Sequence, residues 1–118
     1  LYLSSINRDR RLRLTKRLSL KQYTRNTIVE SDILEEELGL IRKTGIGTDN
    51  EEFVDGMVAC AVPVLDRHGK LFACLFTHAP VIRKSLDELL GYVPMLTNAA
   101  MELSRLIDDP DGDLEGAQ

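Results

Sequence analysis

The sequence predicts an α+β domain in which helices pack on a mostly antiparallel sheet. The first observation behind this prediction is a pair of apolar runs on either side of the tetrad DRHG, residues 66–69, which is typical of a β-hairpin. The second is the recurrence of apolar residues at helical spacing after Ser31 and again after Ser85. At 118 residues, the chain has the length of one domain with a core of moderate size.

The N-terminal quarter combines a short helix with an extended segment. Residues 1–14 predict a weak helix. The next segment, TRNTIVES at residues 24–31, is predicted to be extended because it contains four β-branched residues: Thr24, Thr27, Ile28 and Val29.

A second helix is predicted from residue 31 onward. Ser31 and Asp32 can both act as N-cap, and Glu35 stands where a capping box with Asp32 requires it. Gly45 is predicted to end this helix, because glycine readily adopts the left-handed backbone that follows a helix.

Two strands are predicted next. Residues 53–65 are apolar on both alternating faces, which predicts a strand covered on both sides. One face carries Met57, Ala59 and Ala61, and the other carries Val58, Cys60, Val62 and Val64. Residues 66–69 form the turn, and residues 71–77 return as the second strand.

Ser85 is predicted to cap a long final helix whose apolar stripe continues to Ile107. Pro94 lies inside that stripe and is expected to kink the helix or to mark a joint between two helical pieces. The tail, residues 108–118, is acidic and poor in apolar residues, so we expect it to be disordered.

Composition excludes several classes of protein. Hydrophobic residues make up 43% and charged residues 29%, as in ordinary globular proteins, and no run approaches the roughly 18 apolar residues of a membrane span. Since the chain begins without Met and without a signal peptide, we expect a piece of a longer cytoplasmic protein. Cys60 and Cys74 lie in apolar runs and are interpreted as packing residues.

Charge is distributed unevenly along the chain. Residues 1–25 carry a net charge of +7, whereas the remaining residues carry −11. A basic segment can bind nucleic acid or another anionic partner. Because leucines interleave with these cations and no aromatic stacking series is present, we favour a solvated helix and loop surface over direct nucleic-acid contact.

One stretch resembles a known family. The spacing G-x3-D-x2-E-x6-A-C-A-x2-V-L-D runs from Gly45 to Asp66 and is similar to the signature of the IclR family of bacterial transcription regulators. The flanks agree with it, namely IRKTG before the motif, the hairpin AVPVLDRHGKLFACL, and LLGYVPMLTNAAMELSRLI in the last helix. The similarity extends from about residue 24 to residue 107.

Members of that family join an N-terminal winged helix-turn-helix that binds DNA to a C-terminal, GAF-like domain that binds a small effector and supports oligomerisation. The resemblance therefore implies a GAF-like α+β fold, incomplete at its N-terminus, with residues 1–107 as a partial effector-binding domain. It implies an effector of the organic acid class and a homodimer or homotetramer. DNA would be bound only through the N-terminal domain that this chain lacks. We expect no enzyme activity, no cofactor and no membrane partner.

The resemblance also implies a ligand pocket on the hairpin. Its expected ligand-binding residues are Asp49, Met57, Ala59, Phe76 and His78. If DRHG closed as a two-residue loop, Ala59 would lie opposite Phe76 and Met57 opposite His78, and all four would share one sheet face.

At this pocket the sequence departs from its relatives. Many members have Cys followed by an aliphatic residue where this chain has Ala59 and Cys60, and Ser-x-Ser where it has Phe76, Thr77 and His78. Replacing two serines by Phe and His enlarges the apolar area and leaves one titratable donor. We therefore expect an aromatic or otherwise bulky carboxylic acid as effector.

Other functions find less support. The sequence contains no nucleophile elbow and no phosphate loop that would indicate catalysis by the two cysteines and two histidines. These residues also lack the C-x-x-C or H-x3-H spacing of a metal site. The alternative that stays open is a dimerisation module without a functional ligand site. In that case the hairpin and the long helix would serve association, and Phe76 would fill the cavity.

Overall fold

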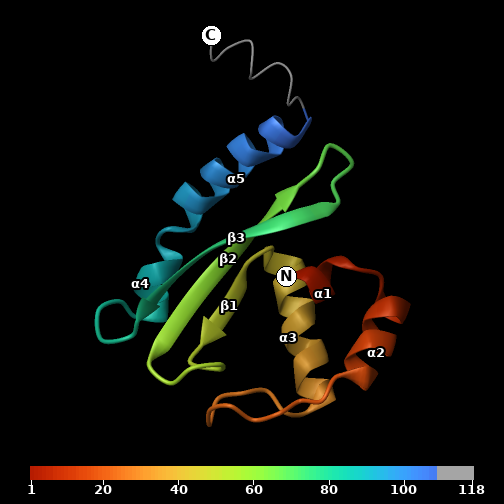
Figure 1. The fold of residues 1–118 in the computed structure, drawn as a ribbon, viewed down its shortest axis with the longest axis vertical. Helices are drawn as coiled ribbons and strands as arrows, with labels where there is room; N and C mark the ends of the chain where they lie inside the picture. Colours follow the sequence, from red (N-terminus) through yellow and green to blue (C-terminus); the bar gives the residue numbers. More distant parts are fainter. Residues whose placement is uncertain (109–118) are drawn as a thin grey trace.

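The computed structural model describes residues 1–108 and has the expected α+β architecture. Its elements are α1 (Tyr2–Ser5), α2 (Arg8–Arg17), α3 (Ser31–Thr44), β1 (Gly47–Asn50), β2 (Met57–Leu65), β3 (Leu71–Pro80), α4 (Leu86–Leu90) and α5 (Val93–Asp108). The strands form one antiparallel sheet in the order β1-β2-β3. Figure 1 shows α4 and α5 along β2 and β3, with α3 next to β1 and α2 beyond α3.

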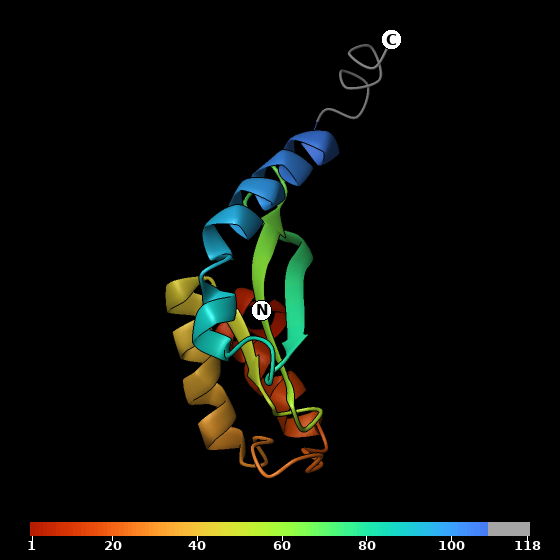
Figure 2. The ribbon, with the colours of Figure 1, turned by 90° about the vertical axis from the view of Figure 1, so that its left-hand side faces the viewer.

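The core lies between one face of β2 and the two C-terminal helices. Figure 2 shows α4 and α5 on the same side of the strands. Every second residue of β2 is buried there, and these side chains pack against Leu89 of α4 and Ala100 of α5: Val58, Cys60, Val62 and Val64. Full burial of such side chains contributes roughly 1.5–3 kcal/mol each.

The opposite face of β2 is only half-buried, so the prediction of a strand covered on both sides is wrong. Ala59 and Ala61 belong to this face. Small apolar residues resemble a buried strand in sequence, but no helix covers them fully. This open face is the surface on which the candidate site lies.

The hairpin closes with a longer loop than expected. The amide of Gly69 donates to the carbonyl oxygen of Asp66 at 2.9 Å, and the amide of Asp66 donates to the carbonyl oxygen of Lys70 at 2.8 Å. Gly69 has a φ of 76°, which glycine adopts without steric cost. The result is a three-residue loop in place of the predicted two-residue loop.

The register of the hairpin is therefore shifted by two residues. One step comes from the longer loop, and the second comes from an irregularity between Val64 and Leu65. Ala59 pairs with His78, where the shorter loop would have paired it with Phe76. Because side chains alternate with a period of two, an even shift keeps the predicted residues on the same face.

Two of the three predicted helix signals are confirmed. Gly45 ends α3 with a φ of 71°, and Ser85 begins α4 with a capping box to Glu88. The capping box predicted for α3 is wrong: Glu30 is its N-cap residue, without a side-chain hydrogen bond. Glu35 instead accepts a charge-assisted hydrogen bond from Nη2 of Arg11 of α2 at 2.7 Å.

The joint expected near Pro94 is also confirmed, since α4 ends at Leu90 and Pro94 lies in the first turn of α5. At the N-terminus, the single helix expected over residues 1–14 is two helices separated at Ile6 and Asn7. Asn7 starts α2 by accepting from the amide of Arg10 at 2.8 Å. The helix α5 includes Asp108, and the rest of the predicted disordered tail lies outside the described residues.

The extended segment predicted for residues 24–31 is not a strand. Its hydroxyl groups bind the loop between β1 and β2: Thr24 Oγ1 donates to the carbonyl oxygen of Glu51 at 2.5 Å, and Thr27 Oγ1 donates to that of Glu52. The two threonines thus contribute hydroxyl hydrogen bonds to loop carbonyl oxygens and not strand structure. This segment therefore braces the acidic loop.

We expect Val58→Ala to destabilise the full-length protein by about 2 kcal/mol, because the lost methyl groups leave a cavity against Leu89. Val54→Ala is the matched control, since Val54 is 47% exposed and Val58 only 1%. Urea denaturation of both variants checks this. Equal destabilisation would show that the β2–α4 interface is not the core.

Two glycines of one helix should respond oppositely to the same substitution. Gly39→Ala should stabilise by about 0.5–1 kcal/mol, since Gly39 lies inside α3 with nothing within 4 Å of the added Cβ. Gly45→Ala should destabilise by about 1–2 kcal/mol, because its left-handed backbone disfavours a Cβ. Thermal denaturation of the two variants measures both signs, and two shifts of the same sign would contradict the observed end of α3.

Candidate functional site

The open face of the sheet is floored by small residues. Two cross-strand rows run over it, Asp49–Ala59–His78 and Gly47–Ala61–Phe76. Directly paired residues project to the same side of a sheet, so the side chains of Asp49, His78 and Phe76 surround the small side chains of Ala59 and Ala61. With strands about 4.8 Å apart, the Cα atoms of Asp49 and His78 are about 10 Å apart.

A hollow of about 370 Å³ lies on this face. It is lined by Leu1, Ile41, Gly47, Thr48, Asp49, Ala59, Cys60, Ala61, Cys74 and Phe76. Three of the predicted site residues, Asp49, Ala59 and Phe76, line it directly. Met57 and His78 lie on the same face but beyond this lining, and Met57 pairs with Pro80 at the end of the hairpin.

Sequence reasoning missed several lining residues. Ala61 and Gly47 could have been found from the alternation of β2 and from the register of β1, had β1 been recognised as a strand. Leu1 and Ile41 come from elements far from the hairpin in sequence, and no local pattern indicates them. Leu1 packs so close to Gly47 that an added Cβ would lie 3.0 Å from its Cγ.

Phe76 borders the hollow on β3, and His78 stacks on Phe76 just beyond the lining. Their rings are stacked, with centroids 5.8 Å apart and planes inclined by 26°. Phe76 is 59% exposed, so its ring projects from the sheet and does not fill the hollow completely. An exposed aromatic pair beside an apolar floor suits a planar ring.

The acidic side chains between β1 and β2 hold the backbone of this loop in place, and Asp49 also borders the hollow. Asp49 lies on β1, not in a loop, and its Oδ1 accepts from the amide of Glu52 at 2.9 Å. Glu52 Oε2 accepts from the amide of Asn50, and Glu51 Oε1 accepts from the amide of Gly56, each at 2.9 Å. These carboxylates satisfy backbone donors where the chain turns sharply with Glu51 at a φ of 56°.

Glu52 is the group in this loop whose ionisation is perturbed. Burial raises the pKa of its carboxyl group, and the negative charge of Asp49 acts in the same direction. The hydrogen bond from the Asn50 amide opposes this rise without cancelling it. The loop therefore places a carboxyl group with reduced acidity directly beside the Asp49 end of the hollow.

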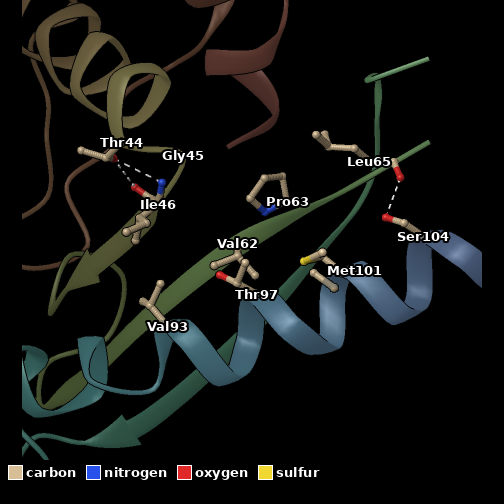
Figure 3. A pocket seen from close by; sticks show the side chains of 11 residues that line it. Thr44, Gly45, Ile46, Val62, Pro63, Leu65, Val93, Thr97, Met101 and Ser104 are labelled. Atoms are coloured by element: carbon tan, nitrogen blue, oxygen red, sulfur yellow. Dashed lines mark hydrogen bonds between the residues drawn. The ribbon is translucent and has the colours of Figure 1, made fainter. Parts of the chain in front are cut away.

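A second hollow, of about 350 Å³, lies between α5, the end of β2 that extends beyond β1, and the C-terminus of α3 (Figure 3). None of its lining side chains is ionisable. Ser104 Oγ donates to the carbonyl oxygen of Leu65 at 2.7 Å, and Thr44 Oγ1 donates to that of Leu40 at 3.0 Å. Two of the three lining hydroxyls thus bind the backbone, which leaves Thr97 and no charged group to orient a polar ligand.

The thiols and histidines do not form a reactive centre. Cys60 is buried, its Sγ lies 3.7 Å from the carbonyl oxygen of Leu89, and burial raises its pKa. Within residues 1–108, no group of three potential metal ligands comes together. The described helices include none that is long and apolar enough to cross a membrane.

Comparison with known proteins identifies the family. The family model for the bacterial transcriptional regulator IclR C-terminal region matches residues 1–105. The probable transcriptional regulator SauR of Cupriavidus necator is 34% identical over 103 residues, which cover 87% of this chain and 41% of SauR. This chain thus spans about two-fifths of the length of that relative.

Solved structures agree in fold. The C-terminal domain of the Escherichia coli regulator KdgR is 35% identical with a TM-score of 0.79, covering 88% of this chain and 64% of that one. The inducer-binding domain of an Acinetobacter PobR double mutant, in complex with 3-hydroxybenzoic acid, is 31% identical with a TM-score of 0.82. That match covers 86% of this chain and 59% of the PobR domain.

These similarities confirm the resemblance carried by the Gly45–Asp66 motif, together with the GAF-like α+β fold that it implies. The curated relatives are transcriptional regulators and not enzymes, in agreement with the expectation from the motif. The chain belongs to the IclR family of bacterial transcriptional regulators and corresponds to the family's C-terminal region.

Proposed function

We propose that this chain is the effector-binding domain of a cytoplasmic transcriptional regulator, and that the hollow on the open sheet face binds a small organic acid. The observation that carries the proposal is the floor of small residues beneath Asp49, Phe76 and His78. A concave apolar surface with a few polar groups at its margin is the usual form of a small-molecule site.

The surrounding side chains favour a hydroxylated aromatic acid. A planar ring can lie on Ala59 and Ala61 with its face or edge against Phe76. The effector's carboxylate would be repelled by Asp49, so it would sit at the His78 end and accept a hydrogen bond from the imidazole. A ring hydroxyl would then donate to the Asp49 carboxylate at the opposite end of the same row.

Similarity to the PobR domain supports this class of ligand, because that domain was crystallised with 3-hydroxybenzoic acid. The regulator as a whole would bind DNA through a helix-turn-helix domain outside this chain and would act as a homodimer or homotetramer. Effector binding would change DNA affinity only to the extent that the effector prefers one arrangement of the oligomer over another.

A dimerisation module without a ligand site is the second candidate. It is favoured by the exposed apolar residues along α5, where Met95 is 68%, Met101 54% and Leu106 47% exposed. Exposed apolar surface often marks a protein interface. The two candidates differ in whether the hollow on the sheet binds anything.

A hydroxybenzoic acid should raise the melting temperature of the full-length protein, because a ligand that binds only the native state stabilises it by about 2.7 kcal/mol at 100 times its Kd. Asp49→Asn and His78→Ala should both abolish the shift. Asparagine at position 49 keeps the oxygen that accepts from the Glu52 amide, so the loop is preserved.

The chain offers matched controls for both substitutions. Asp55→Asn is the control for Asp49→Asn, because Asp55 is exposed in the same loop. His68→Ala is the control for His78→Ala, because His68 is exposed in the hairpin turn. Both controls should keep the wild-type shift. Absence of a shift with benzoic, hydroxybenzoic and aliphatic acids alike would favour the dimerisation module.

Phe76→Ala should weaken binding of an aromatic acid about tenfold while affecting an aliphatic acid less, because the ring contact is worth about 0.5–1.5 kcal/mol beyond simple burial. Phe72→Ala is the control, since Phe72 is on the same strand and 64% exposed but does not line the hollow. Titration calorimetry measures the two affinities. Stronger binding by the Phe76 variant would show that Phe76 blocks the hollow.

A further inference from the structure

One side of α2 is a strongly basic surface. Successive helix residues are rotated by about 100°, so four cations of α2 fall within an arc of about 120°. These four exposed residues, called the α2 basic face below, are Arg10, Arg13, Lys16 and Arg17. They span eight residues, or about 10 Å of helix from the first Cα to the last.

A partly buried ion pair between Arg11 and Glu35 determines which side of α2 faces outward. Arg11 and Thr15 lie on the inner side and are 7% and 6% exposed. Arg11 Nε and Nη2 donate to Glu35 Oε1 of α3 at 3.0 and 2.7 Å, and Arg11 Nη1 donates to the carbonyl oxygen of Ile6 at 3.3 Å. With Arg11 held in this way, the α2 basic face must point away from α3.

The α2 basic face lies at the edge of the molecule and keeps its charge. Figure 1 shows α2 on the far side of α3 from the strands. An ion pair within 4.0 Å joins Arg11 to Glu35, and none is seen between the four cations and a carboxylate of residues 1–108. Asp9 lies on the same side of α2, four residues before Arg13, so the net charge of this side is +3. Arg10 donates to the uncharged hydroxyl of Tyr2 at 3.2 Å.

We propose that the α2 basic face binds the phosphate backbone of DNA that flanks the operator. The inference rests on the proposed function, in which the full-length protein binds DNA through another domain. Duplex DNA carries one charge per about 3.4 Å of each strand, so 10 Å of α2 can run alongside about three phosphates of one strand. Such contacts need cations but no base-reading side chains. This revises the sequence-based interpretation of the segment as merely solvated.

The structure favours duplex DNA over other polyanions. A membrane-binding helix needs an exposed apolar face, whereas Leu12 and Leu14 of α2 are half-buried against the protein. Single-stranded nucleic acid is bound through stacked aromatic side chains, and α2 contains none. The net charge of −4 for the whole chain also makes general attraction to DNA weak, so binding would be confined to this face.

The test uses the full-length protein and an operator selected by it from a randomised DNA pool. Two duplexes are compared, the selected core alone and the core with about 15 added base pairs on each side. Affinity is measured by fluorescence anisotropy between 50 and 200 mM salt. Each phosphate contact contributes about 0.9 to the slope of log K against log salt.

The variant Arg10→Gln/Arg13→Gln/Lys16→Gln/Arg17→Gln removes the α2 basic face. Its matched control, Arg42→Gln/Lys43→Gln/Arg83→Gln/Arg105→Gln, removes four exposed cations elsewhere and changes the net charge equally. The variant should lower the magnitude of the salt slope by about 2–4 on the flanked duplex and by nothing on the core duplex. The control should leave both slopes unchanged, and Arg10→Lys/Arg13→Lys/Arg17→Lys should retain the wild-type slope.

Each other result overturns a specific statement. A pool that enriches no sequence would overturn DNA binding by the full-length protein, and the inference would fall with it. If a sequence is enriched but variant and wild type have equal salt slopes on the flanked duplex, the inference about the α2 basic face is overturned and the proposed DNA binding stands. Sedimentation with vesicles of anionic lipid that depends on the α2 basic face, without a change in slope, would assign the surface to a membrane and overturn it as well.

Discussion

The central strand β2 imposes the constraint on which the rest of the structure depends. Its even-numbered residues are large enough to form a core with α4 and α5, and its odd-numbered residues at 59 and 61 are alanines. Because neighbouring residues of a strand face opposite sides, one segment can build the core and leave a low floor behind it. A one-residue slip would exchange the two faces and destroy both, so the core and the hollow share one register.

The carboxylates that precede β2 are explained by backbone hydrogen bonding. The turn between β1 and β2 contains a left-handed Glu51, and it exposes amides that neighbouring carboxylates accept. Thr24 and Thr27 satisfy carbonyl oxygens of the same turn from a segment 25 to 27 residues earlier. The rim of the hollow is thus braced from both sides, which positions Asp49 on a rigid strand end and not on a mobile loop.

A charged contact joins the N-terminal helix α2 to α3, in addition to the packing of Leu1 against Gly47. Arg11 is buried, and Glu35 holds it on α3, which leads through Gly45 into β1. The ion pair lowers the pKa of the Glu35 carboxyl group, chiefly through its hydrogen bond with the guanidinium. The same contact turns the remaining cations of α2 outward, so a single buried arginine determines the character of a whole surface.

The sequence by itself determined the elements whose signals are local. The hairpin at DRHG, the glycine that ends α3, the capping box at Ser85 and the joint near Pro94 all depend on residues a few positions apart. The family resemblance depends on one contiguous motif and was equally accessible. The shared face of Ala59, Phe76 and His78 followed from alternation, and it survived a wrong loop length because the error was even.

Tertiary structure alone decided the features that join distant segments. Glu35 is an ion-pair partner and not a helix cap, because Arg11 lies 24 residues earlier in sequence but beside it in space. The strand β1 exists because β2 offers it a partner, and four residues of mixed polarity carry no strand signal of their own. Leu1 and Ile41 complete the hollow for the same reason. Local propensity acts over a few residues, whereas contacts of this kind depend on how the whole chain packs.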